Sequence, residues 1–290
     1  TKFAQVKDIP AGSSSVIKFK RYANFAVATT ALVEGVTPVG KKLSETIVTA
    51  TALQYGDFVT LTDKLTMTTE DPVRMEANMI LGDQAGNTID QLCRDVMVAG
   101  TNVIYSGTGN TANADVAAGD VITLANIQTA EETLKVANTR WMTSFVDPAT
   151  GYNTVPLPPC FVGICHVYTT KTIRAMTGFT KVELYAQPGA RMEGEIGKIE
   201  NTRFIETVNA KVYTAAGTGS IDVYATLIMG QHAYGISRIS GHAMENIVKP
   251  LGSAGTADPL NQRETSGWKA TFVAKILNDD FIIRIVHARV

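Results

Sequence analysis

An amphipathic stretch from Asp71 to Gly100 constrains the possible folds of this chain more than any other feature. Its apolar residues recur at spacings of three and four, which places them in one stripe of an α-helix: Val73, Ala77, Leu81, Ala85, Ile89, Leu92 and Val96. Asp71 is the expected N-cap, Pro72 suits the first helical position, and Gly100 is the expected stop. A helix over 71–99 would be a rod of roughly 40 Å. The simple interpretation is a long core helix, and the more specific one is a spine on which several sheets pack.

Two glycines, Gly82 and Gly86, lie one turn apart inside this predicted helix. Each costs about 1 kcal/mol relative to alanine, so their presence predicts that another backbone passes close to them. Four charged residues interrupt the apolar run, which excludes a membrane span: Asp83, Asp90, Arg94 and Asp95.

The composition is that of a globular chain with material for one large or two modest domains. Of the 290 residues, 45% are hydrophobic and 18% are charged, and the net charge is −1. The near balance of 26 basic and 27 acidic residues argues against a dedicated nucleic-acid binder. We expect no signal peptide and no membrane helix. The three cysteines, Cys93, Cys160 and Cys165, are expected to be reduced, buried thiols.

The N-terminal part predicts an arm followed by a long hairpin. Residues 1–15 show little apolar periodicity, and we expect them to be ordered only against another surface. Residues 16–33 and 43–62 read as two strands of a ribbon that could reach roughly 50 Å. A two-stranded ribbon is marginally stable alone and has two open edges. Two interpretations stay open: the hairpin lies across a neighbouring copy of the protein, or it packs on its own domain.

The rest of the chain predicts a mixture of helices and strands. A second helix is expected from 124 to about 140 with Thr123 as N-cap, and a short one is expected to end near Met176. The proline-rich stretch 148–159 reads as a connector, and 250–267 as a loop. The expected strands are 203–214, 221–229, 232–239, 271–277 and 281–287, the last two joined by a tight turn at 278–280.

The sequence offers little catalytic chemistry. It lacks the phosphate-loop, nucleophile-elbow and zinc-protease motifs. Cys165 and His166 are adjacent in a predicted strand and would point to opposite faces, and together with Cys160 they lack the spacing of a metal site. We therefore predict no catalytic, cofactor-binding or metal-binding residues.

Two charged clusters remain as candidate contact sites. The stretch 193–200 is rich in carboxylates and suggests acid–base chemistry, but a solvated turn before a strand is the commoner explanation. Its basic neighbours are expected to pair with these carboxylates across a subunit contact. The turn-rich segment 34–42 ends in two lysines and reads as a solvated or interfacial hairpin tip, with phosphate binding as the weaker alternative. The predicted interface residues are Glu34, Lys41, Lys42, Arg191, Glu193, Glu195, Lys198 and Arg203.

The order of these parts resembles the major capsid proteins of tailed bacteriophages, which share the α+β HK97-type fold. Five phrases look like the N4-like branch of that family: Val16-Ile-Lys-Phe-Lys-Arg-Tyr22, Thr29-Thr-Ala-Leu-Val-Glu-Gly-Val-Thr-Pro38, Gln54-Tyr-Gly-Asp57, Gly194-Glu-Ile-Gly-Lys-Ile-Glu-Asn-Thr-Arg-Phe204 and Trp268-Lys-Ala-Thr-Phe272. The resemblance covers nearly the whole chain.

The resemblance implies an organisation and a function. Residues 1–15 would be the N-terminal arm and 16–63 the extended E-loop. Residues 64–145 with 256–290 would form the peripheral P-domain, and 146–255 the axial A-domain. Hexamers and pentamers would build an icosahedral shell around double-stranded DNA. The shell would contact this DNA non-specifically, and a portal and scaffolding or decoration proteins would be further partners. The protein would be assembled in the host cytoplasm and reside in the virion, without a cofactor or membrane. Lys41 or Lys42 lies where some relatives carry a cross-linking lysine, but we do not predict that bond.

Two alternatives remain. A cellular nanocompartment shell would keep the fold and enclose enzymes in place of a genome. An α/β hydrolase-like enzyme would use the carboxylates near Glu193 and Glu200, and would form a small oligomer with a pocket of convergent polar groups.

Overall fold

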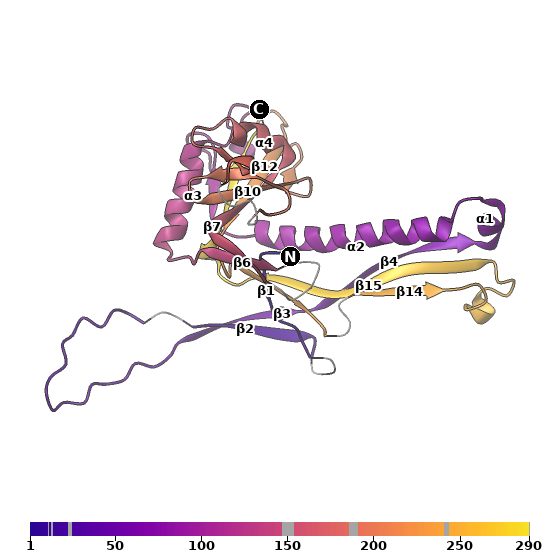
Figure 1. Ribbon diagram of the computed structural model, residues 1–290, viewed down its shortest axis with the longest axis horizontal. Helices are drawn as coiled ribbons and strands as arrows, with labels where there is room; N and C mark the ends of the chain where they lie inside the picture. The colour runs from indigo at the N-terminus through magenta and orange to yellow at the C-terminus, as the bar shows by residue number, and fades with distance from the viewer. Residues whose placement is uncertain are drawn as a thin grey trace.

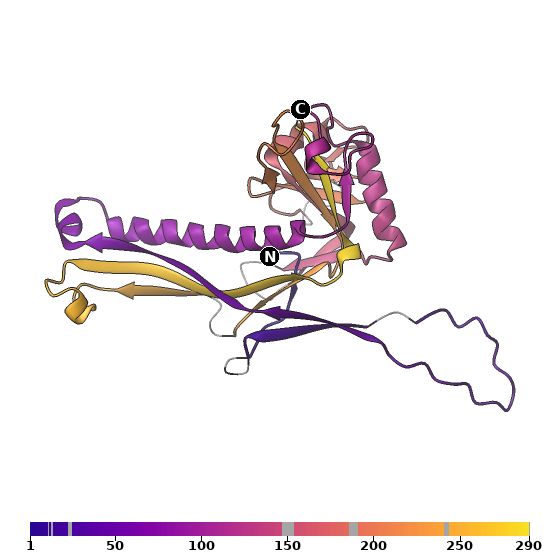
Figure 2. The same cartoon turned by 180° about the vertical axis from the view of Figure 1, so that it is seen from behind.

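A computed structural model gives the structure of the chain for residues 1–10, 12, 14–22, 25–146, 154–185, 191–240 and 244–289. A compact body lies near the middle of the molecule, and two extensions leave its base in opposite directions (Figure 1). One is a long arm of helix and strand, and the other is a narrow hairpin that ends in an open loop. The same arrangement is seen from behind in Figure 2.

The long arm is built around the predicted spine helix. This helix, α2 (Val73–Val98), has 26 residues and is about 39 Å long. Its N-cap is Pro72, so the prediction of Asp71 as N-cap was wrong: Asp71 lies outside the helix and its carbonyl accepts a hydrogen bond from Val73 N at 2.8 Å. At the other end, the Arg284 guanidinium donates to the carbonyl oxygen of Val98. That bond satisfies one of the terminal carbonyls that a helix leaves open and ties the helix to the body.

The prediction of a close backbone contact at the α2 glycines was wrong for a single chain. A Cβ built on Gly82 or Gly86 would meet no atom within 4 Å. The close approach lies instead in the sheet under α2, where a Cβ on Gly267 would come within 2.6 Å of Phe58 Cβ.

A five-stranded sheet joins the long arm to the hairpin root. Its strands are β1 (Gln5–Val6), β13 (Tyr234–Arg238), β15 (Arg263–Ile276), β14 (Met244–Lys249) and β4 (Leu53–Thr62). The order is β1-β13-β15-β14, and β4 pairs antiparallel with β15 over ten residues. Helix α2 covers one face, with Ala85 packed against Trp268 and Ala270. Gln84 joins the layers, accepting from Trp268 Nε1 at 3.2 Å and donating to Asp57 Oδ2 at 2.6 Å. The N-terminal residues therefore lie on their own chain, because β1 pairs with β13.

The hairpin is shorter than the sequence predicted. Strands β2 (Val16–Tyr22) and β3 (Glu45–Thr51) pair antiparallel, and their root is buried through Ile17, Phe19 and Ala50. After Ala52 the chain leaves the hairpin, and β4 joins β15 instead. Because β4 pairs with β15, its apolar face lies under α2. A two-stranded ribbon could not cover that face. Residues 25–44 carry no regular strand.

The compact body is a nine-stranded sheet with a helical layer. The strands are β5 (Val103–Tyr105), β6 (Met142–Val146), β7 (Thr154–His166), β8 (Thr180–Lys181), β9 (Glu195–Ile199), β10 (Thr202–Thr207), β11 (Val212–Tyr213), β12 (Val223–Met229) and β16 (Ile282–His287). The order is β5-β16-β12-β7-β10-β9-β8, with β11 on β12 and β6 on β7. In the described part of the molecule as a whole, the helical elements besides α2 are α1 (Asp63–Thr68), α3 (Leu124–Val136), α4 (Val167–Arg174), η1 (Asn113–Asp115), η2 (Val182–Leu184), η4 (Gly255–Ala257) and η5 (Asp279–Phe281).

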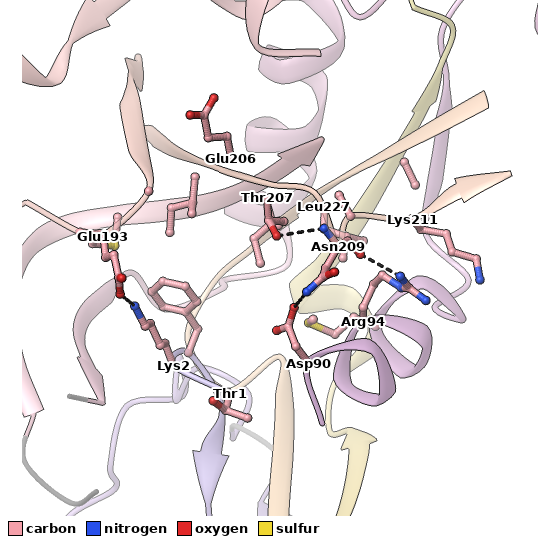
Figure 3. Close-up of a pocket in the computed structure, with 18 of the residues that line it drawn as sticks. Thr1, Lys2, Asp90, Arg94, Glu193, Glu206, Thr207, Asn209, Lys211 and Leu227 are labelled. Carbon is pink, nitrogen blue, oxygen red and sulfur yellow. Dashed lines mark hydrogen bonds and ion pairs between the residues drawn. The ribbon is translucent and has the colours of Figure 1, made fainter. Parts of the chain in front are cut away.

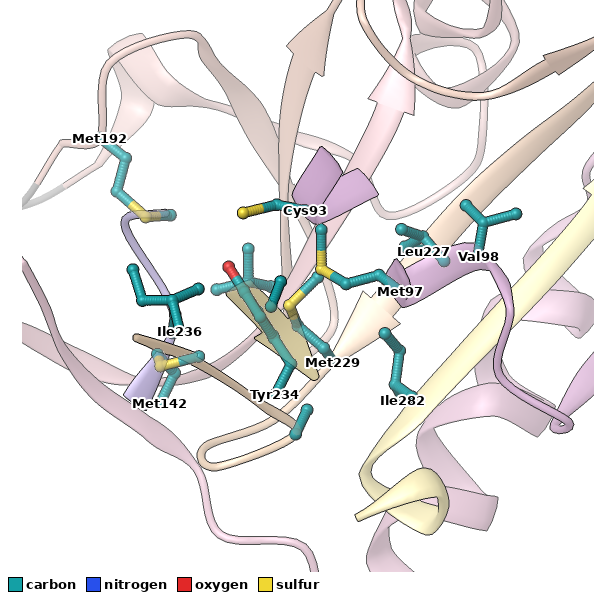
Figure 4. Packing of buried hydrophobic residues seen from close by; sticks show 14 of the residues in the cluster. Cys93, Met97, Val98, Met142, Met192, Leu227, Met229, Tyr234, Ile236 and Ile282 are labelled. Atoms are coloured by element: carbon teal, nitrogen blue, oxygen red, sulfur yellow. The ribbon is translucent and has the colours of Figure 1, made fainter. Parts of the chain in front are cut away.

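The two largest apolar clusters both lie in the body. One packs α3 and α4 on the sheet, through Ile127 and Leu134 against Phe161 and Phe204. The other joins the body to the arm, where Cys93 and Met97 of α2 meet Met229 of β12 and the fully buried Tyr234 of β13 (Figure 4). The spine helix therefore ends inside the main core.

Several element predictions need correction. Helix α3 is capped by Thr123 as predicted, with Thr123 N to Asn126 Oδ1 at 3.0 Å, but it ends at Val136. The 148–159 connector is strand from Thr154 onward, and 148–153 lie outside the described residues. The 203–214 strand divides into β10 and β11, and β15 begins at Arg263, inside the predicted loop. The predicted C-terminal hairpin is wrong, because β15 and β16 belong to different sheets.

Among the described residues, no helix combines the length and the apolar character needed to cross a membrane.

Candidate assembly surfaces

The hairpin loop 25–44 is an apolar surface without cover from its own chain. Its large apolar side chains are more than half exposed: Phe25, Val27, Leu32, Val33, Val36, Val39 and Leu43. Val39 is 96% exposed. Within the loop, Lys41 Nζ donates to the carbonyl of Ala26 at 2.8 Å and so joins its two sides. An exposed apolar patch of this kind marks a contact surface.

The eight predicted interface residues fall into two separate groups. Glu34, Lys41 and Lys42 lie exposed in the hairpin loop. The other five lie in the compact body, at and near β9 and β10: Arg191, Glu193, Glu195, Lys198 and Arg203. Arg191 and Lys198 are exposed, and neither takes part in an ion pair within the described residues.

Glu195 and Arg203 are not surface residues. Their side chains are 0% and 5% exposed, and the pair is formed within one chain, so the predicted solvated turn and intersubunit pairing were wrong for them. Tyr185 OH donates to Glu195 Oε1 at 2.8 Å, and Met192 N donates to Oε2 at 3.0 Å. Burial, reinforced by the bond to Glu195, raises the pKa of Tyr185. Burial opposes the charge of Arg203, but contact with Glu195 keeps the pKa of its guanidinium above the ordinary value.

Glu193 stays exposed and binds the N-terminal segment. Lys2 Nζ lies 2.5 Å from Glu193 Oε2, and this contact lowers the pKa of the Glu193 carboxyl. The pair lies at the rim of a cavity of about 430 Å³ between α2 and the sheet of the body (Figure 3). Across the cavity, Asn209 donates to Asp90 at 3.1 Å, and its carbonyl accepts from Arg94 at 2.9 Å. None of the described residues that line this cavity is a cysteine, serine or histidine.

The structure reveals a second exposed surface that the sequence analysis missed. The distal end of the long arm presents four apolar side chains, all more than 60% exposed: Met67, Met75, Met79 and Ile80. Exposed carboxylates accompany them at Glu70, Asp71 and Glu76. The signal was present, because Met75, Met79, Gly82 and Gly86 form a second stripe with helical spacing.

The three cysteine thiols are free and buried. Burial raises the pKa of the Cys160 thiol to about 11 and that of Cys165 to about 12. No group of three His, Cys, Asp or Glu side chains in the described part of the chain is placed to hold a metal ion.

Solved structures of phage capsids match this architecture over the whole chain. The capsid of Ralstonia phage GP4 gives a TM-score of 0.73 at 16% identity, covering 100% of this chain and 88% of that one. The head of Helicobacter pylori bacteriophage KHP40 gives 0.70 at 12% identity, with the same coverage of both chains. The capsid of cyanophage P-SCSP1u gives 0.66 at 14% identity, again covering 100% and 88%. By sequence, no family model and no curated protein matches.

Identities this low establish the fold and nothing beyond it. The chain adopts the HK97-like fold of phage capsid subunits, which confirms the predicted α+β fold.

Proposed function

We propose that this protein is a major capsid protein, which assembles into the icosahedral head shell of a tailed phage around its double-stranded DNA. The observation that carries the proposal is the hairpin loop 25–44, whose apolar side chains have no cover in the subunit. The fold shared with phage capsid subunits supports it.

The surface chemistry favours an obligate assembly. Obligate interfaces bury about 2,000–5,000 Å² and are apolar. The hairpin loop and the distal end of the long arm both expose large apolar side chains, on opposite extensions of the molecule. A lone subunit would leave both in water, and neighbouring copies would cover them.

The domain division belongs to the same proposal. Residues 1–15 act as the N-terminal arm. Within 16–63, the hairpin up to Thr51 acts as the E-loop and its loop 25–44 lies across a neighbouring copy, whereas β4 stays in the sheet of the long arm. Residues 64–145 with 256–290 form the P-domain, and 146–255 form the A-domain around the axes of pentamers and hexamers. The role is structural and not enzymatic, and the location is the virion.

The near-neutral charge suits a container for DNA. Tight phosphate binding at every subunit would strengthen with falling salt and would hinder movement of the genome during packaging. The net charge of −1 fits weak, non-specific contact with DNA. A portal, and scaffolding or decoration proteins, would complete the particle.

Negative-stain microscopy of the purified chain, with sedimentation analysis, tests the proposal. We expect uniform shells or rings, and double-stranded DNA inside particles isolated from their natural source. A compact monomer whose hairpin loop 25–44 is covered by its own body would overturn it. Particles that enclose protein and no nucleic acid would identify a nanocompartment instead.

A further inference from the structure

The charges of this nearly neutral chain are separated between its two extensions. Residues 16–44, which contain the hairpin loop, carry five basic residues and one acidic residue. Residues 63–83, at the far end of the long arm, carry five acidic and two basic residues. One of those two bases is already engaged, since Arg74 Nε donates to Glu264 Oε1 at 3.0 Å. The opposite ends of the molecule therefore carry opposite charge.

The acidic end is a projecting tip. We define it as Glu70, Asp71 and Glu76, which surround the start of α2. All three are exposed, and none forms an ion pair within the described residues. Met67 and Met75 stand beside them at 78% and 63% exposure. The tip therefore offers uncompensated carboxylates together with apolar surface.

The basic end contains a cleft. A cavity of about 660 Å³ separates the hairpin root from the base of the body. Arg21 of β2 lines one side, and Arg140 and His232 of the body line the other. Asp280 is the single acidic residue among those that line it, and Lys20 is paired with Glu45 at 3.2 Å. Burial, together with a smaller effect of the nearby Arg140, lowers the pKa of His232.

The tip and the cleft cannot meet within one chain. The tip lies at the start of α2, which is about 39 Å long, and the other end of this helix lies in the core of the body. The hairpin, whose root lines the cleft, leaves the body on the side opposite the long arm in both views (Figures 1 and 2). A contact between them must join two copies. Because it uses two different surfaces, it is a heterologous contact, which builds rings when the rotation closes.

We propose that the acidic tip of one copy docks in the basic cleft of a second copy, with Glu70, Asp71 and Glu76 facing Arg21 and Arg140. This inference rests on the proposed shell function, and it names a specific contact within that assembly. The apolar side chains beside the tip would lie against Tyr22, which lines the cleft and is 52% exposed.

Charge reversal tests the contact. The tip variant is Glu70→Lys/Glu76→Lys, the cleft variant is Arg21→Glu/Arg140→Glu, and a third variant combines all four changes. Glu132→Lys/Glu183→Lys is the matched control, since it alters the net charge as the tip variant does at two other exposed positions. Circular dichroism checks that each variant folds.

At low ionic strength, we expect the tip and cleft variants each to raise the concentration for half-assembly roughly tenfold. The combined variant should return to near the wild-type value, because its charges are again complementary. The control should assemble like the wild type. A tip variant that behaves like the control, or a combined variant no better than either double variant, would overturn the inference.

Cross-linking separates this inference from the shell proposal. A carbodiimide joins a carboxylate directly to a lysine amine, and a mixture of ¹⁴N- and ¹⁵N-labelled chains reveals which links join two copies. We expect mixed-isotope links from Lys20 to Glu70, Asp71 or Glu76. Such links in a small oligomer, without shells, would support the contact and contradict the shell; shells or oligomers without them would contradict the contact.

Discussion

Arg203 and Glu195 form a two-point ion pair inside the compact body, with Nε to Oε1 and Nη2 to Oε2 both at 2.6 Å. With the bonds from Tyr185 and Met192, the carboxylate accepts four hydrogen bonds. A buried charge of this kind is stable only while its partner remains.

Replacing Glu195 with alanine should therefore destabilise the subunit strongly. We expect a loss of about 3–5 kcal/mol in the free energy of unfolding, because Arg203 would stay buried without its counter-ion. Denaturant titration measures it. Glu193→Ala is the control two residues away: its side chain is 84% exposed, and the expected loss is much smaller than that of Glu195→Ala. Equal losses in the two variants would show that burial of the Glu195–Arg203 pair is not what matters.

Acid should weaken the fold through His287. Burial lowers the pKa of this histidine from 6.5 to about 4, while its Nδ1–H donates to the Ala288 carbonyl at 2.8 Å and Nε2 accepts from Thr226 Oγ1 at 2.9 Å. Between these two pKa values the unfolded chain binds a proton that the folded chain does not. The stabilisation is complete above about pH 6.5 and is lost as the pH falls toward 4, by roughly 3 kcal/mol in total.

The free energy of unfolding at pH 7, 6 and 5, for the wild type and His287→Gln, checks this. The wild type should lose more stability than the variant over this range, since carboxylates and the other histidines act equally in both. Parallel curves would rule His287 out as the cause.

Two glycine substitutions should act in opposite directions. Gly86→Ala adds a methyl group that meets nothing within 4 Å and removes a flexible residue from a helix, so it should stabilise the isolated subunit by about 1 kcal/mol. Gly267→Ala forces a methyl group against Phe58 Cβ and the Asp57 carbonyl, and should cost about 1–3 kcal/mol. Thermal unfolding of the unassembled protein measures both; a stabilising Gly267→Ala would show that β4 and β15 are less closely apposed.

Deleting residues 34–42 should leave a folded subunit that assembles poorly. The segment is exposed and carries no regular strand, so circular dichroism and the melting temperature should change little. Particle yield, measured by sedimentation, should fall sharply. A Gly/Ser segment of equal length serves as the second variant and separates loop length from side-chain contacts. Intact shells from the deleted form would show that the loop tip is not an assembly element.

The sequence predicted the elements whose signals are local. Helix α2 followed from a long apolar period, and the start of α3 followed from the Thr123 cap. It failed at β4, because residues 45–62 form one β-branched run that resembles a single strand. The division at Ala52 depends on β15, about two hundred residues away. Strand pairing between segments so far apart in the sequence cannot be detected from the apolar periodicity of either segment.

The candidate site was predicted only in part. The hairpin loop was identified from its composition and its length, and the structure leaves it exposed. Burial of Glu195 was missed, although a weak signal existed: Arg203 directly precedes Phe204 and Ile205 in a strand, and a charge that is buried there requires a partner. The acidic tip was not predicted, because the apolar stripe that faces the core dominates the helical pattern of α2 and the exposed methionines form a second, weaker stripe.

Strand β15 runs without a break for fourteen residues, from the far end of the long arm toward the base of the body, and continues through η5 into β16 of the other sheet. A tensile force applied at the end of the long arm would therefore be transmitted along the covalent backbone into the body. The hydrogen bonds between β4 and β15 lie across the direction of that pull, so they would bear the load together in shear. The long arm and the body would therefore resist tension as one mechanical element.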